Sequence, residues 1–215
     1  MKRIGKILCL LLALLFLAVI ALAWWQRDNL KALYQAKTED AETILRKSQE
    51  QLETHQKELE QYNVILKAPT QAEKDKLLSG ENVETPEQKE PIPEEMPAEQ
   101  PTVQSILDRC IQELYDCEIA LMARLGTMKQ EALDEWRALP ESQRTKEKKL
   151  EIGYRGLDAC YELEVEIDAQ VQGILAKHRT ELESIKADTA PLDTLWKYYC
   201  DEKESAKAYY LNKYL

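Results

Sequence analysis

The chain opens with an unbroken apolar run, and this run constrains the fold more than any other feature. Residues 7–25 read ILCLLLALLFLAVIALAWW and follow three basic residues, Lys2, Arg3 and Lys6. A helix of this length spans about 28 Å, close to the hydrocarbon thickness of a bilayer. The basic residues favour a cytoplasmic N-terminus. The sequence therefore predicts a single-pass plasma-membrane protein with a cytoplasmic tail (residues 1–6), a transmembrane anchor (residues 7–25) and an extracytoplasmic remainder.

The alternative for the same run is a cleavable signal peptide. Ala21, Leu22 and Ala23 form a small-x-small triplet, and a basic segment before an apolar one also describes a secretory signal. Cleavage after Ala23 would give a secreted protein. The run is longer than a usual signal core of about 7–15 residues, and two tryptophans follow the triplet. These features favour a retained anchor.

Composition predicts the fold class of the rest. The chain has only 6 Gly and 1 Phe, with abundant Ala, Leu, Glu and Lys, which indicates an all-α protein. Its net charge is −10, and no segment beyond residue 25 is basic. Because binding to phosphates needs an excess of Lys and Arg, nucleic acid is not expected as a partner.

Residues 26–66 are predicted to form a helical stalk. Leu45, Leu52, Leu59 and Leu66 recur every seven residues, which is the spacing of a coiled coil. No neighbouring segment before residue 102 offers a face to cover this stripe. We therefore expect parallel self-association through the stalk, with a solvated single helix as the alternative.

Residues 67–101 are predicted to be a disordered linker. Proline removes backbone donors and clustered glutamates repel one another, so such a segment resists folding. Six of the eight prolines lie here: Pro69, Pro86, Pro91, Pro93, Pro97 and Pro101.

Residues 102–215 are predicted to form an elongated antiparallel three-helix bundle. Apolar residues follow helical spacing from Thr102 to Leu139, from about Lys146 to Lys186, and again from Pro191. The first helix is expected to stop at Pro140. Because Gly126 precedes a pair with capping-box spacing, a break at this glycine is the alternative.

This region resembles a helical module at the C-terminal ends of uncharacterised, membrane-anchored or exported proteins of Gram-positive anaerobic bacteria. The matching stretches are LPESQRT (residues 139–145) and EKESAKAYYL (residues 202–211). The resemblance implies a helical fold and a bacterial surface setting. It carries no known activity and no site residues.

Four cysteines lie in the predicted bundle. Counting helix levels from the two turns places Cys110 within about 5 Å of Cys200 along the axis, whereas Cys117 and Cys160 lie about 12 Å apart in height. A disulfide needs Cα atoms within about 7 Å. Cys110–Cys200 is therefore the only feasible pair in this register, but buried free thiols are expected in preference to that disulfide.

A contact surface is predicted at the tip of the first two helices. The third helix is shorter than the two it packs on, so the tip should consist of two helices alone, which cannot bury a full apolar stripe. An uncovered apolar patch usually marks an interface. The candidate contact residues are Leu125, Met128, Trp136, Leu139, Leu150, Tyr154 and Leu157.

Enzyme motifs are absent from the sequence, which has no nucleophile elbow, zinc-protease signature or phosphate-binding loop. No catalytic, cofactor-binding or metal-binding residues are therefore expected. The sequence predicts a non-enzymatic protein that presents a helical interaction or scaffold domain to an unknown protein partner. The alternative is a cell-wall glycan-binding module that uses the C-terminal aromatics Trp196, Tyr198, Tyr199, Tyr209, Tyr210 and Tyr214.

Overall fold

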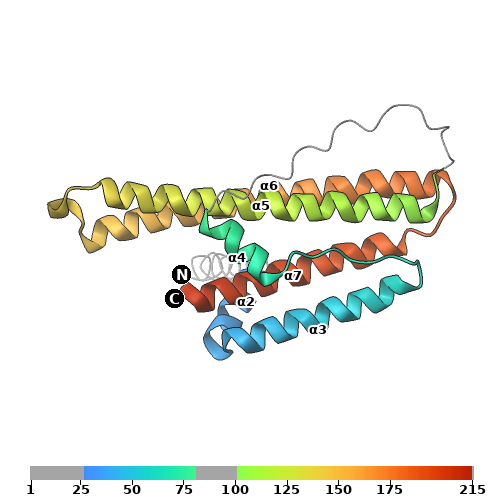
Figure 1. Cartoon of the computed structure of the whole chain (residues 1–215), viewed down its shortest axis with the longest axis horizontal. Coiled ribbons are helices and arrows are strands. Elements are labelled where there is room, and N and C mark those ends of the chain that lie inside the picture. The colour runs from blue at the N-terminus through green and yellow to red at the C-terminus, as the bar shows by residue number, and fades with distance from the viewer. Residues whose placement is uncertain (1–26, 81–100, 215) are drawn as a thin grey trace, which may run out of the picture. The chain divides into compact units, whose positions relative to one another are not determined.

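The structure is a computed structural model, and it describes residues 27–80 and 101–214. Within these two stretches every regular element is a helix, which confirms the all-α fold class there (Figure 1). The elements are α2 (Arg27–Thr38), α3 (Ala41–Glu60), α4 (Gln71–Ser79), α5 (Val103–Ala138), the 3₁₀ turn η1 (Glu141–Gln143), α6 (Lys146–Ser184) and α7 (Ala190–Tyr214).

The predicted anchor, residues 7–25, lies outside the described residues, as do residues 81–100 of the predicted linker. Among the helices that are described, none combines the length and the apolar character that a membrane span requires.

The chain forms two compact units. The hairpin unit is Glu58–Trp196, and the terminal unit consists of Met1–Lys57 and Lys197–Leu215, of which residues 27–57 and 197–214 are described. Helices α3 and α7 each contribute residues to both units.

Helices α5 and α6 form a long antiparallel hairpin in the hairpin unit (Figure 1). The Thr102 hydroxyl begins α5 by accepting a hydrogen bond from the backbone N–H of Ser105 (3.2 Å), and Thr145 begins α6 in the same way with Lys148 (3.2 Å). At the turn, the Arg144 guanidinium donates to the carbonyls of Leu139 (3.0 Å) and Arg137 (2.7 Å). These bonds satisfy backbone N–H and C=O groups that have no hydrogen-bond partner within the helix at its ends.

Helix α5 continues through Gly126, so the alternative of a break there is wrong. The glycine is a packing position for α4. A Cβ built on Gly126 would lie 2.3 Å from the carbonyl oxygen of Leu77. No residue with a side chain fits this approach, so glycine lets the two backbones come into contact.

Helix α4 corrects the predicted linker for residues 67–80. A capping box begins the helix: Thr70 accepts from the N–H of Glu73 (3.3 Å), and the Glu73 carboxylate accepts from the N–H of Thr70 (2.7 Å). Gly80 ends the helix with φ of 73°. The buried Lys74 pairs with Glu118 of α5 at 2.9 Å. This segment is folded because its ends are capped and one face packs on α5.

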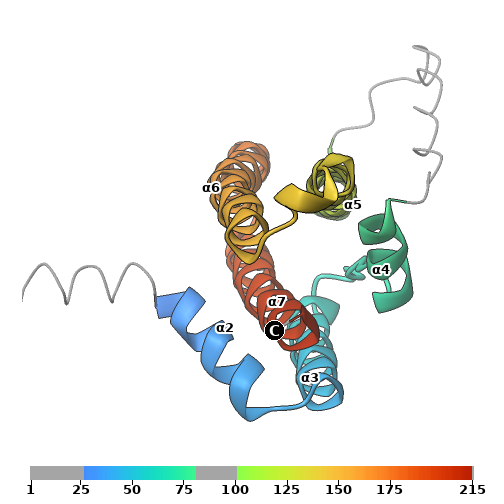
Figure 2. The same cartoon turned by 90° about the vertical axis from the view of Figure 1, so that its left-hand side faces the viewer.

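The stalk prediction considers only segments before residue 102, whereas the helix that lies against α3 comes later in the chain. In the terminal unit α3 lies alongside α7 (Figure 2). His55, 2% exposed, contacts Asp201 at 2.9 Å, and Ser48 donates to Glu202 at 3.0 Å. Leu59 is buried, but the other three leucines of the stripe are half-buried. Part of the stripe is therefore covered within the chain, and parallel self-association through residues 26–66 stays a prediction.

Helix α2 completes the terminal unit. Asn212 of α7 donates to the carbonyls of Ala36 and Glu39 at the end of α2, both at 2.9 Å. A small core joins the three helices, and its members are Ala32, Ile44 and Ala208, with Tyr209 and Leu211 packed against it.

The predicted three-helix bundle over residues 102–215 also needs correction. Leu192 and Leu195 at the start of α7 are fully buried and belong to the hairpin unit. From Lys197 onward α7 belongs to the terminal unit. The unit that contains the hairpin therefore begins at Glu58 and ends at Trp196, because residues before the linker and the first turns of α7 complete its core.

Candidate contact surface

The inner face of α6 packs on the rest of the hairpin unit and carries its core. Ile152, Leu163, Ile167 and Val171 are 2–6% exposed, and Leu182 is fully buried. Burying a leucine or isoleucine side chain contributes about 1.5–3 kcal/mol. This face therefore holds the hairpin together.

A second apolar stripe runs along the opposite face of α6. At about 100° per residue, its members lie on the far side of the helix from Ile152 and Leu163. We call it the outer stripe, and its five residues with their exposed fractions are Leu150 (49%), Tyr154 (65%), Leu157 (62%), Tyr161 (44%) and Val165 (56%).

Ion pairs between α5 and α6 fix the orientation of this face. Arg155 donates to Glu135 at 2.5 Å, and Arg124 donates to both carboxylate oxygens of Glu166 at 2.8 and 2.9 Å. Both Arg124 bonds come from the same nitrogen, Nη1, which therefore lies between the two oxygens of the Glu166 carboxylate. These pairs join the two helices and leave the outer stripe turned away from α5.

The seven predicted contact residues divide between the two helices. Leu150, Tyr154 and Leu157 on α6 are exposed and lie in the outer stripe. The four on α5 are half-buried: Leu125, Met128, Trp136 and Leu139. The structure thus brings three of the predicted residues into one line and does not bring the other four to it. Tyr161 and Val165 were missed, although the four-three-four-four spacing from residue 150 could have identified them.

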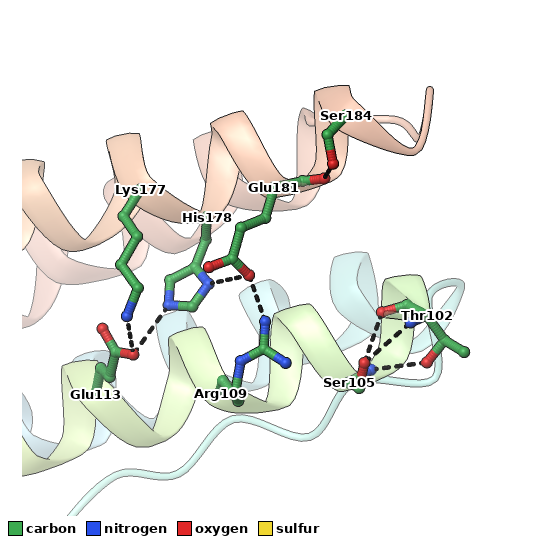
Figure 3. Close-up of polar contacts among 8 residues, drawn as sticks. All are labelled: Thr102, Ser105, Arg109, Glu113, Lys177, His178, Glu181 and Ser184. Atoms are coloured by element: carbon green, nitrogen blue, oxygen red, sulfur yellow. Dashed lines mark hydrogen bonds and ion pairs between the residues drawn. The ribbon is translucent and has the colours of Figure 1, made fainter. Parts of the chain in front are cut away.

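A polar cluster joins α5 and α6 near the open end of the hairpin (Figure 3). His178 is fully buried, with Nε2 at 3.3 Å from Glu113 and Nδ1 at 3.5 Å from Glu181. Lys177 donates to Glu113 at 2.6 Å, and Arg109 donates to Glu181. Burial raises the pKa of Glu113, but the Lys177 hydrogen bond and the nearby His178 together bring that pKa below its ordinary value. The cluster fixes the register of the two helices.

The thiols offer no reactive centre in the hairpin unit. Cys110 is a buried free thiol and Cys200 a half-buried one. They belong to different compact units, and a disulfide between them stays a prediction. Burial, together with the Glu113 charge, raises the pKa of Cys110 to about 12. Because the thiolate is the reactive form, Cys110 is chemically inert near neutral pH. Partial desolvation by neighbouring side chains also raises the pKa of Cys160 on α6.

The C-terminal tyrosines pack within the terminal unit. Tyr198 lies edge-on to His55 with ring centroids 6.1 Å apart, and Tyr209 lies edge-on to Tyr210 at 5.1 Å. Each of these tyrosines is half-buried. Glycan binding by the C-terminal aromatics stays a prediction.

In the described stretches no group of three or more His, Cys, Asp or Glu residues is placed to hold a metal ion. Comparison with models of known protein families, with curated proteins and with solved structures found no match to this chain.

Proposed function

We propose that this chain is a non-enzymatic, single-pass membrane protein whose hairpin unit presents the outer stripe to a protein partner. The observation that carries the proposal is the stripe itself, five large apolar side chains that are 44–65% exposed along one face of α6. Single exposed apolar residues are common on soluble surfaces, but a contiguous line of them marks an interaction site.

The residue types in the stripe support a protein partner. Tyrosine is among the side chains that contribute most at protein interfaces, and Tyr154 and Tyr161 lie on either side of the central Leu157. The stripe stands on a helix of 39 residues that is held by core packing and ion pairs. A rigid support lowers the entropy that binding costs.

The membrane part of the proposal rests on the sequence. Residues 7–25 have the length and apolar character of a span, and the basic residues before them favour a cytoplasmic N-terminus. On this basis the two compact units are extracytoplasmic, and the anchor holds the outer stripe close to the cell surface, where it scaffolds a partner.

Photo-cross-linking in intact membranes tests the proposed contact. We expect a benzophenone amino acid in place of Tyr161 to give a covalent adduct of increased mass, because the partner covers the outer stripe. The matched control places the same group at Glu162, the next residue of α6, which is exposed but faces away from the stripe. Adducts of equal yield at both positions, or none at Tyr161, would overturn the proposal.

A further inference from the structure

We propose that the partner of the outer stripe is a second copy of this chain, docked α6 against α6 in antiparallel orientation. This inference rests on the proposed function and names the occupant of the same surface. It depends on two features of α6: the symmetry of the stripe and the distribution of charge along the helix.

The outer stripe is symmetric about its own centre to within one residue. Its residues are spaced four, three, four and four apart, and a twofold axis between Leu157 and Asp158 pairs each with an apolar residue of the other copy. Leu150 then meets Val165, Tyr154 meets Tyr161, and Leu157 meets Leu157. The two tyrosine pairs can adopt the edge-to-face contact that aromatic rings favour. Every exposed apolar side chain of the stripe is covered in this register.

Charge along α6 selects the antiparallel orientation. The N-terminal end, residues 144–151, has four basic residues against Glu147 and Glu151. Residues 156–176 contain no Lys or Arg, and their carboxylates are Asp158, Glu162, Glu164, Glu166 and Asp168. A parallel pair would set this acidic segment beside its own copy, which is repulsive.

The antiparallel register instead brings opposite charges to the same level. Lys146 of one copy lies within one residue of the level of Asp168 of the other, and at about 100° per residue both project to the same side of the stripe. Complementary charges of this kind set the orientation and partner choice of paired helices. Small residues at one edge of the stripe, Gly153 and Cys160, allow the helices to approach. A Cβ built on Gly153 meets nothing within 4 Å.

Cysteine cross-linking of the full chain in membranes tests the orientation. The native cysteines are first replaced by serine or alanine, and single cysteines are then introduced and oxidised with copper-phenanthroline. We expect Leu157→Cys to form a disulfide-linked dimer, because the two copies of position 157 meet at the twofold axis. Val165→Cys alone should remain monomeric, because its two copies lie about 22 Å apart along the helices. Mixing Leu150→Cys chains with Val165→Cys chains should restore the dimer.

Charge reversal is the second test of the antiparallel contact. Asp168→Lys should reduce the Leu157→Cys dimer at least about threefold, and a partner chain with Lys146→Glu should restore it, as paired charges at helix edges do. Cross-linking of Val165→Cys to itself would show a parallel pair and overturn the inference. If Leu157→Cys gives no dimer while the Tyr161 photo-adduct contains another protein, the second copy is excluded and the proposed function stands. If neither experiment gives an adduct, both proposals fail.

Discussion

Leu182→Ala should lower the free energy of unfolding by about 2–5 kcal/mol, the usual cost of removing a fully buried leucine side chain. Leu182 lies on the inner face of α6 and has no exposed surface. The truncation leaves a cavity between α6 and its neighbours that the surrounding helices fill only in part. Urea denaturation of the full chain in lipid nanodiscs, at a concentration below that of self-association, measures the loss.

The matched control is Leu157→Ala, the same substitution on the same helix. Leu157 is 62% exposed, and surface substitutions usually change stability by less than about 0.5 kcal/mol. We therefore expect the variant to unfold like the unmodified chain. Equal losses for both leucines would mean that the outer stripe is packed within a single chain, and the contact surface would have to be abandoned.

Gly126→Ala should detach α4 from α5. The added methyl carbon would lie 2.3 Å from the Leu77 carbonyl oxygen, and a backbone atom cannot move aside as a side chain can. Overpacking of this kind costs about 1–3 kcal/mol, which outweighs the gain of about 1 kcal/mol that alanine brings over glycine in a helix. Hydrogen exchange of residues 71–80 should become much faster, while exchange in α6 stays slow.

Gly153→Ala is the control for that experiment. Gly153 also lies in a long helix of the hairpin, but its built Cβ meets nothing within 4 Å. The substitution should stabilise the chain by up to about 1 kcal/mol through helix propensity alone and leave α4 in place. Slow exchange of residues 71–80 in Gly126→Ala would show that α4 does not depend on this close approach.

Local signals in the sequence predicted the helices of the hairpin well. The first helix was expected from Thr102 to Leu139 and spans Val103–Ala138, and the second was expected from about Lys146 to Lys186 and spans Lys146–Ser184. Capping threonines and Pro140 act through neighbouring backbone groups, so their effect can be inferred without knowledge of the fold.

The packing partners could not be inferred in the same way. Helix α3 packs on α7, about 150 residues later in the chain, through contacts such as Ser48–Glu202. Heptad spacing shows that a face must be covered, but it does not say which segment covers it. The same limit applied to α4, whose capping box at Thr70 and Glu73 was present in the sequence but lay in a segment dominated by its prolines and glutamates.

The candidate surface was predictable only in part for a related reason. Helix α6 has two apolar stripes. Helical periodicity identifies both of them but does not show which one is buried. The structure separates them, because Ile152 and Leu163 pack inward while Tyr154 and Leu157 remain exposed. The sequence predicts the half-buried residues of α5, such as Trp136, in the same patch because it suggests that nothing covers the two helices at the tip.

Cysteine labelling at position 157 tests most directly whether the outer stripe is a contact surface. In a chain whose native cysteines have been replaced, Leu157→Cys should react rapidly with a membrane-impermeant maleimide in dilute nanodiscs that hold one copy. In intact membranes, where its partner is present, the same thiol should react at least about tenfold more slowly, because buried interface atoms exclude water and reagent. Glu162→Cys, beside the stripe, should react at the same rate in both preparations. Equal rates for Leu157→Cys in the two preparations would contradict the account.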